Sequence, residues 1–196
     1  MKKVIGLTGG IASGKSTVSK KLKELGCYIA DADEVSRTLL YPGGAAFEEA
    51  KRVFSEFVGK DGLFDRRALG AHVFSDKEAL LKLNSITHPV IVKLISEDIK
   101  DRNGIIIIDA PLLIEVGLNT LCDKVWLVVA DRQTRIERAA KRSGLSYEET
   151  AARIDSQMSD EEKMKYADTV IDNYGSIEDL EKCVERLFGE ETDGAS

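Results

Sequence analysis

The chain has 196 residues, which is enough for one well-packed α/β core with small insertions. Hydrophobic residues make up 43% of it and charged residues 32%, so the composition is that of an ordinary soluble globular protein. The net charge of −6 argues against a general attraction to nucleic acid or to an anionic membrane. No apolar stretch resembles a signal segment or is long enough to span a bilayer, so we expect a cytoplasmic protein.

Short apolar runs alternate with helical patterns along the chain, which is typical of a parallel sheet with helices on both faces. The predicted strands are 3–8, 27–30, 105–108, 124–130 and 169–171. Helices are predicted at 16–25 and at 177–188, each with one apolar face. Residues 190–196 are small and polar, and we expect them to be frayed.

Two segments interrupt this alternation. Residues 34–103 contain no convincing strand and are predicted to be wholly helical, which suggests a separate lobe that holds a substrate. Within them, Pro89 lies inside the apolar pattern of a long helix at 77–100, so we expect a kink or break near His88. Residues 131–164 form the second segment, which is charged and also predicted to be helical.

The three cysteines give no sign of a metal site or a disulfide framework. Cys27, Cys122 and Cys183 are odd in number and far apart, and neither His72 nor His88 completes a metal-ligand spacing with them. We expect half-buried free thiols in a reducing compartment.

The most informative motif is G-G-I-A-S-G-K-S at residues 9–16, directly after the first predicted strand and before the first helix. It matches G-x-x-x-x-G-K-[ST], the phosphate-binding loop of nucleoside-triphosphate enzymes, rather than a simple Gly-rich turn. Backbone N–H groups of such a loop converge on an anion, Lys15 reaches the β- and γ-phosphates, and the Ser16 hydroxyl ligates Mg²⁺. We expect the nucleotide to be bound by Gly10, Ile11, Ala12, Ser13, Gly14, Lys15, Ser16 and Thr17.

Carboxylates follow two of the predicted strands, at the sheet edge where open parallel sheets bind ligands. After the second strand, Asp31 or Asp33 can accept the proton of an attacking hydroxyl, and Asp33 can equally cap the next helix. Arg37 either pairs with Asp33 or holds a substrate phosphate. Asp109 resembles a Walker B carboxylate that assists Mg²⁺ through water, although strands often end in Asp.

Four arginines in the second helical segment are spaced by three, three and four residues: Arg132, Arg135, Arg138 and Arg142. This spacing predicts one helix face and a local anion site, with at least one arginine on a phosphate. The alternative is a solvated face with ion pairs such as Asp131 with Arg135. Arg153 and Gln157 are predicted to extend the same surface, although Glu149 offers Arg153 a partner.

Taken together, these stretches resemble one family, the dephospho-coenzyme A kinases. The matching residues are 5–16, 31–33 with Arg37, His88-Pro89, 109–115, 133–145, 153–157 and 167–175. The loop alone is shared by many enzymes, but this combination in this order is specific and extends over about 1–188. Ala12 departs from the family, which often has Gly there, at a variable position of the loop.

The resemblance implies an α/β P-loop NTPase fold like that of nucleoside-monophosphate kinases, with a five-stranded parallel sheet and helices on both faces. The implied domains are a core at 1–33, 104–131 and 165–196, a helical coenzyme A lobe at 34–103, and a helical lid at 132–164. The implied reaction is phosphorylation of the 3′-hydroxyl of dephospho-coenzyme A by ATP with Mg²⁺, the last step of coenzyme A synthesis. We expect a monomer with no nucleic-acid or membrane partner.

The resemblance also implies residue roles. Asp33 would accept the proton, and Lys15, Arg138 and Arg142 would act on the phosphates, the two arginines when the lid closes. Thr8, Arg37 and His88, with Asp33, would bind the acceptor substrate, although a lone His88 in an apolar helix also suits a packing role. The competing interpretations are another small-molecule kinase, a non-catalytic nucleotide-binding module, and a GTPase, which the absence of N-K-x-D disfavours.

Overall fold

Five strands form one sheet in the computed structural model, which describes residues 2–144 and 146–193. The strands are β1 (Lys2–Thr8), β2 (Tyr28–Asp31), β3 (Gly104–Asp109), β4 (Lys124–Val129) and β5 (Thr169–Asp172). Their order is β2-β3-β1-β4-β5, with β1 parallel to β3 and β4, and β4 parallel to β5. Leu7 lies opposite Asp109, so β1 and β3 end together and the loop after β1 begins at the carboxyl edge of the sheet. The predicted five-stranded sheet is confirmed.

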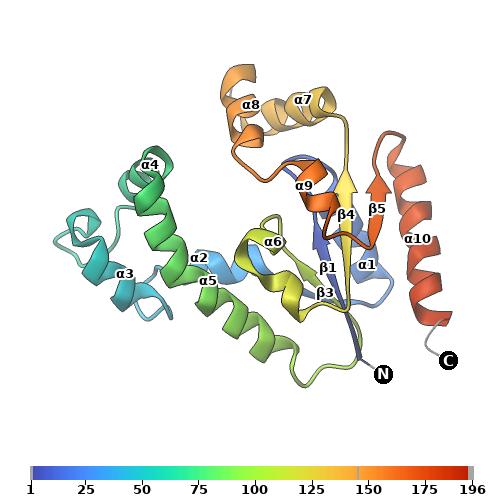
Figure 1. Cartoon of the computed structure of the whole chain (residues 1–196), viewed down its shortest axis with the longest axis horizontal. Helices are drawn as coiled ribbons and strands as arrows, with labels where there is room; N and C mark the ends of the chain where they lie inside the picture. Colours follow the sequence, from blue (N-terminus) through green and yellow to red (C-terminus); the bar gives the residue numbers. More distant parts are fainter. Residues whose placement is uncertain (1, 145, 194–196) are drawn as a thin grey trace. The chain divides into compact units, whose positions relative to one another are not determined.

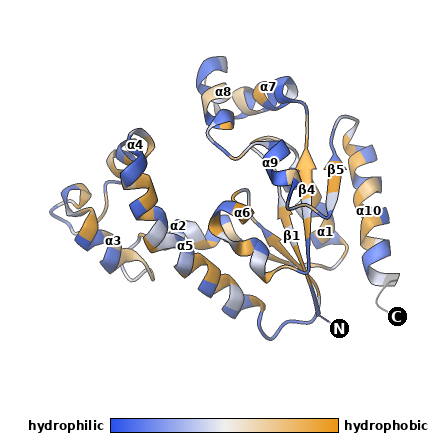
Figure 2. Ribbon diagram, viewed as in Figure 1, coloured by the Kyte–Doolittle hydropathy of each residue, from blue (hydrophilic) through white to orange (hydrophobic). Residues whose placement is uncertain are grey.

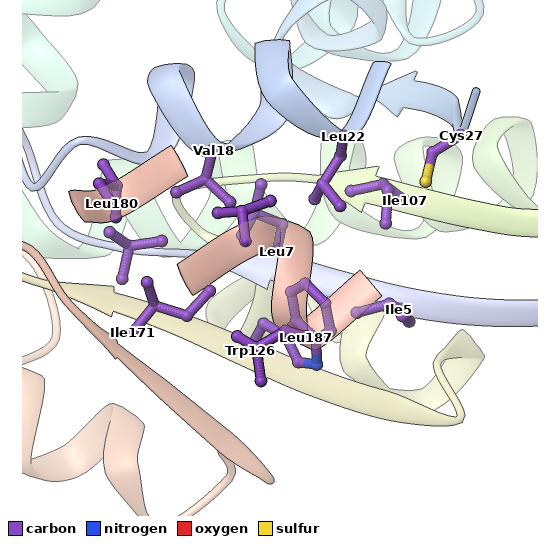
Figure 3. Close-up of a cluster of buried hydrophobic side chains, with 12 residues drawn as sticks. Ile5, Leu7, Val18, Leu22, Cys27, Ile107, Trp126, Ile171, Leu180 and Leu187 are labelled. Atoms are coloured by element: carbon purple, nitrogen blue, oxygen red, sulfur yellow. The ribbon is translucent and has the colours of Figure 1, made fainter. Parts of the chain in front are cut away.

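Helices cover both faces of this sheet (Figure 1). On one face, α1 (Lys15–Glu24) and α10 (Ile177–Asp193) pack on a core of alternate strand residues, among them Ile5, Leu7 and Trp126 (Figure 3). Strands buried on both faces are apolar along their buried length, as the colour of β4 after Lys124 shows in Figure 2. Each large apolar side chain buried here contributes about 1.5–3 kcal/mol.

The other face of the sheet carries α6 (Leu113–Val116), η2 (Leu118–Leu121) and α9 (Asp160–Met164). Gly6 allows α6 to approach closely, because a Cβ there would lie 2.6 Å from the Leu113 side chain and 2.8 Å from Cys122 Sγ. Beyond the carboxyl edge, α7 (Arg132–Ser143) packs against α8 (Tyr147–Asp155). Capping boxes begin α8 at Ser146 and α9 at Ser159.

The chain divides into two compact units, one formed up to Ala30 and from Asp101 onward, and a second from Asp31 to Lys100. The second unit contains α2 (Ala32–Thr38), α3 (Phe47–Val53), η1 (Ser55–Phe57), α4 (Arg66–Ser75) and α5 (Lys77–Ile99). Turns connect these helices, and apart from Asp31 at the end of β2, the β-type pairing described in this unit is one antiparallel bridge between Val58 and Phe64. The predicted division into core, lobe and lid remains a prediction about function.

Two local predictions need correction. Helix α5 runs through Pro89 without a break, because α2, α3 and α4 pack along it and bury Ile86 and Ile91 on either side of the proline, and the alternative of a kink near His88 stays a prediction. Helix α10 continues to Asp193 rather than fraying from residue 190, because buried Glu191 forms ion pairs with Lys3 and Lys124. Residues 194–196, and position 145 of the matched stretches, lie outside the described residues.

None of the described helices is both long enough and apolar enough to cross a membrane. The three cysteines are free thiols, as predicted, and Cys27 is buried while Cys122 and Cys183 are half-buried.

Candidate phosphate-binding site

The loop of residues 9–14 connects β1 to α1 through two backbone positions in the left-handed region. Gly14 has a φ of 104° at the N-cap of α1, a conformation that glycine adopts without strain. Ala12 has a φ of 60°, which costs an L-residue roughly 1–2 kcal/mol and explains why glycine suits this position. The loop also closes on itself, since the Ser13 N–H donates to the Gly10 carbonyl at 3.1 Å. The first N–H groups of α1 lack intrahelical acceptors, an arrangement that favours a bound anion.

Side chains from distant elements hold this loop. The Asn173 amide, directly after β5, donates to the Ser13 carbonyl at 2.8 Å. Gln157 accepts the Ile11 N–H at 3.0 Å, and Arg135 Nε donates to the Ile11 carbonyl at 2.9 Å.

Two glycines make these close contacts possible. A Cβ on Gly10 would lie 2.0 Å from Arg135 Nη2, and one on Gly14 would lie 2.1 Å from Asn173 Nδ2. The loop therefore needs glycine at both positions for packing as well as for backbone freedom.

Lys15 and Asp109 form an ion pair at the carboxyl ends of β1 and β3. The Asp109 carboxylate is buried, and the pairing holds the Lys15 ammonium beside the loop. The ammonium has three donors, so contact with Asp109 leaves two for a phosphate oxygen. Asp109, predicted to resemble a Walker B carboxylate, therefore pairs directly with Lys15 of the loop.

The residues present fit a magnesium ion that a nucleotide brings with it. Ser16 is exposed and lines the loop pocket, and its hydroxyl is a hard oxygen donor of the kind that Mg²⁺ prefers. Asp109 already accepts a hydrogen bond from Lys15, so it would contact the magnesium ion through a water molecule. Across residues 2–144 and 146–193, no group of three or more His, Cys, Asp or Glu side chains could hold a metal, so the remaining ligands would be phosphate oxygens and water.

The four arginines of α7 do not share one environment, contrary to the prediction. Arg138 and Arg142 line a pocket of about 290 Å³ together with loop residues Ala12, Gly14, Ser16 and Thr17 and with Asn173. Arg135 is only 6% exposed and donates to Ile11 and, at 2.9 Å, to Asp160. Arg132 is exposed and bonds Asp155 with both Nε and Nη2, at 3.2 and 2.7 Å. The physical reason is position along the helix: Arg135, in the first turn, lies against Ile11 and Asp160, whereas Arg138 and Arg142, further along, line the loop pocket.

The alternative ion pairs predicted for this segment are also wrong. Asp131 caps α7 by accepting the Thr134 N–H at 2.9 Å, and this hydrogen bond holds the pKa of its carboxyl below the usual value. Arg135 pairs with Asp160 instead. Glu149 closes the capping box of α8 and does not pair with Arg153. Gln157 bonds the loop backbone and also lines a pocket with Arg132 and Arg135, as predicted for the arginine surface.

The predicted acceptor-side residues lie mainly in the second unit. Asp31 caps α2 by accepting the Glu34 N–H at 3.0 Å, so the capping role left open for Asp33 belongs to Asp31. Asp33 and Arg37 are exposed on α2, and His88 is half-buried on α5, a helix that packs against α2. Thr8 is buried in the first unit, and its hydroxyl donates to the Pro111 carbonyl at 3.2 Å.

Sequence reasoning missed several residues that the structure brings to this edge. Asn173 follows a strand, as Asp33 and Asp109 do, and the same argument from strand ends would have found it. Lys163 of α9 is fully buried, with Nζ 2.7 Å from the Pro111 carbonyl and 3.4 Å from Glu115 Oε1. Nothing in its charged helical context distinguishes it from a solvent-exposed lysine.

Comparison with known proteins gives a consistent result. A family model described as dephospho-CoA kinase matches residues 3–179. The dephospho-CoA kinase of Carboxydothermus hydrogenoformans is 48% identical over 180 residues, covering 89% of this chain and 87% of that one. The solved dephospho-CoA kinase from Campylobacter jejuni is 32% identical, with a TM-score of 0.72 and all of both chains covered. A Thermus thermophilus structure, TT1252, is 39% identical, with a TM-score of 0.83 and 96% and 97% of the chains covered. These similarities confirm the predicted fold class.

Proposed function

This chain belongs to the dephospho-CoA kinase family, and we propose how its own residues carry out the ATP-dependent phosphorylation of dephospho-CoA. The reaction transfers a phosphoryl group to the 3′-hydroxyl and gives coenzyme A and ADP, the final step of coenzyme A biosynthesis. The observation that carries the proposal is that Arg138 and Arg142 line the same pocket as the loop residues Gly14, Ser16 and Thr17.

On the donor side, the loop binds the β- and γ-phosphates of ATP. The N–H groups at the start of α1 donate to phosphate oxygens, and Lys15 adds a cation from its position beside Asp109. Arg138 and Arg142 stabilise the charge of the transferring phosphoryl group, since one guanidinium can donate two parallel hydrogen bonds to two phosphate oxygens. Closure of the 132–164 segment as a lid would exclude water that otherwise hydrolyses ATP.

We include Mg²⁺ in this proposal. Ser16 would ligate the ion directly and Asp109 through water, because both offer hard oxygen donors. The chemistry such an ion supplies is neutralisation of the charge on the β- and γ-phosphates.

On the acceptor side, Asp33 accepts the proton of the 3′-hydroxyl. The oxygen of that hydroxyl attacks the γ-phosphorus of ATP, and the bond between the γ-phosphorus and the bridging oxygen breaks as ADP leaves. Asp31 already caps α2, which supports a role for Asp33 other than capping. Arg37 and His88 bind the acceptor substrate. The Thr8 hydroxyl donates to the Pro111 carbonyl, so Thr8 supports the end of β1 rather than offering a free hydroxyl to the substrate. We also propose that the protein is a monomer in the cytoplasm, without nucleic-acid or membrane partners. The free cysteines suit the cytoplasm, which is a reducing compartment.

The test of these roles is turnover with dephospho-CoA, with adenosine and gluconate as control acceptors. Coenzyme A should form only with dephospho-CoA. Asp33→Asn should lower kcat by about 10²–10⁴-fold, the usual contribution of a general base, and leave ATP binding unchanged. Glu34→Gln, the neighbouring exposed carboxylate, is the matched control and should retain activity. Turnover of Asp33→Asn near that of the wild type would refute the base assignment.

A further inference from the structure

Both polar groups of Ile11 in the phosphate-binding loop are bonded to side chains from the 132–164 segment. Gln157 accepts the Ile11 N–H, and Arg135 donates to the Ile11 carbonyl, at 3.0 and 2.9 Å. Arg135 belongs to the first turn of α7 and Gln157 follows the end of α8, so the start and the end of the α7–α8 pair are tied to one loop residue. We call Arg135, Gln157 and Ile11 the Ile11 clamp.

Arg135 is anchored in this clamp by bonds on two of its nitrogens. Its guanidinium is buried, lies against Gly10 so closely that a Cβ would meet it at 2.0 Å, and bonds Asp160 with Nη1. With Nε on the Ile11 carbonyl and Nη1 on a carboxylate, the guanidinium is held in one position against the loop backbone.

The clamp also lies next to the strained position of the loop. Ala12 follows Ile11 directly and has a φ of 60°, a conformation that persists only where surrounding contacts hold it. Asn173 holds the Ser13 carbonyl on the other side of Ala12. The strained residue is therefore flanked by two backbone groups that distant side chains fix.

We propose that Arg135 and Gln157 are positioning residues that act through Ile11: they hold the loop in the conformation that binds the nucleotide. They also tie that conformation to the position of the 132–164 segment. The inference rests on the proposed function only in taking ATP as the nucleotide. Because the two residues hold the two peptide units that flank the Ile11 Cα, their effects on nucleotide affinity are not independent.

The experiment compares Arg135→Met, Gln157→Met and the double variant by calorimetric binding of a non-hydrolysable ATP analogue and by steady-state kinetics. Each single variant should weaken binding of the analogue, and raise KM for ATP, by about five- to ten-fold, as expected for one lost hydrogen bond. The double variant should bind no more weakly than the worse single variant. The kcat at saturating ATP and the KM for dephospho-CoA should stay close to wild type.

Arg132→Met is the matched control, because it removes the same charge one turn earlier in α7, where the arginine is exposed and pairs with Asp155. An equal loss of affinity in this control would overturn the proposal, as would additive effects in the double variant. A collapse of kcat in Arg135→Met with unchanged nucleotide affinity would make Arg135 a catalytic residue instead. Should Arg135→Met fail to fold, Gln157→Met, a neutral change of similar size, still decides the question. Absence of coenzyme A from wild-type enzyme would refute the proposed function while leaving the binding comparison valid.

Discussion

Lys163 gives the sharpest prediction about stability, because it is a fully buried cation with two identified partners. Its Nζ lies 2.7 Å from the Pro111 carbonyl and 3.4 Å from Glu115 Oε1, and neither oxygen of Glu115 has a hydrogen bond among the described residues. Lys163→Met keeps most of the apolar side chain but leaves a carboxylate without its counter-charge. Removing one partner of a buried pair costs about 3–5 kcal/mol, and the 22% exposure of the Glu115 side chain places this case near the lower end.

We therefore expect Lys163→Met to lower the free energy of unfolding by about 3 kcal/mol, or Tm by roughly 6–12 °C for a chain of this length. Glu115→Leu should cost a similar amount, because it leaves the ammonium buried with one carbonyl. The double variant removes both charges, and its free energy of unfolding should fall by only about 1 kcal/mol. The Pro111 carbonyl, which loses Lys163, still accepts a hydrogen bond from the Thr8 hydroxyl.

Urea unfolding of the four proteins, followed by circular dichroism, gives the coupling free energy directly. A parallel cycle on Lys20 and Glu24, an exposed pair at 3.7 Å, should show coupling within error of zero. If the losses of Lys163→Met and Glu115→Leu simply add in the double variant, the two charges do not stabilise each other, and the reasoning from burial fails.

Beyond the Asp33 and Ile11-clamp experiments above, two further predictions follow from burial. Burial raises the pKa of Cys27 to about 11 and that of Cys122 to about 12. Iodoacetamide at about pH 8 should therefore label the native protein first at Cys183, which peptide mass mapping would show. Early labelling of Cys122 would contradict this prediction. Burial opposes ionisation of Glu191, but Lys124 and Lys3 outweigh it and hold its pKa below the usual value for a glutamate. The stabilisation by this ion pair is therefore present at neutral pH and is lost as the pH falls through the lowered folded-state pKa. Unfolding free energies of wild type and Glu191→Gln should accordingly differ at pH 7 and converge in acid, and a constant difference would contradict the ion-pair explanation.

Most of the core of this protein was predictable from local pattern. Each predicted strand lies within one or two residues of an observed strand, because runs such as Ile105–Ile108 are apolar on both faces and can only be central strands. The loop at 9–16 was equally recognisable, since its glycines, lysine and serine each meet a short-range requirement for holding a phosphate. Asp109 and Asp33 were found as candidates because they follow strands.

Other features depended on residues that meet only in the folded chain. Arg135 lies 124 residues from Ile11, Asn173 lies 160 residues from Ser13, and Lys163 lies 52 residues from Pro111. Periodicity placed four arginines on one helix, but the packing of α7 decided that one is buried, one is paired at the surface and two line the loop pocket. Local sequence thus determined where the phosphate loop and the strands form, because backbone geometry and burial period are short-range properties. Only the tertiary structure decided which polar side chains hold that loop, because burial and hydrogen-bond partners depend on which distant elements come into contact.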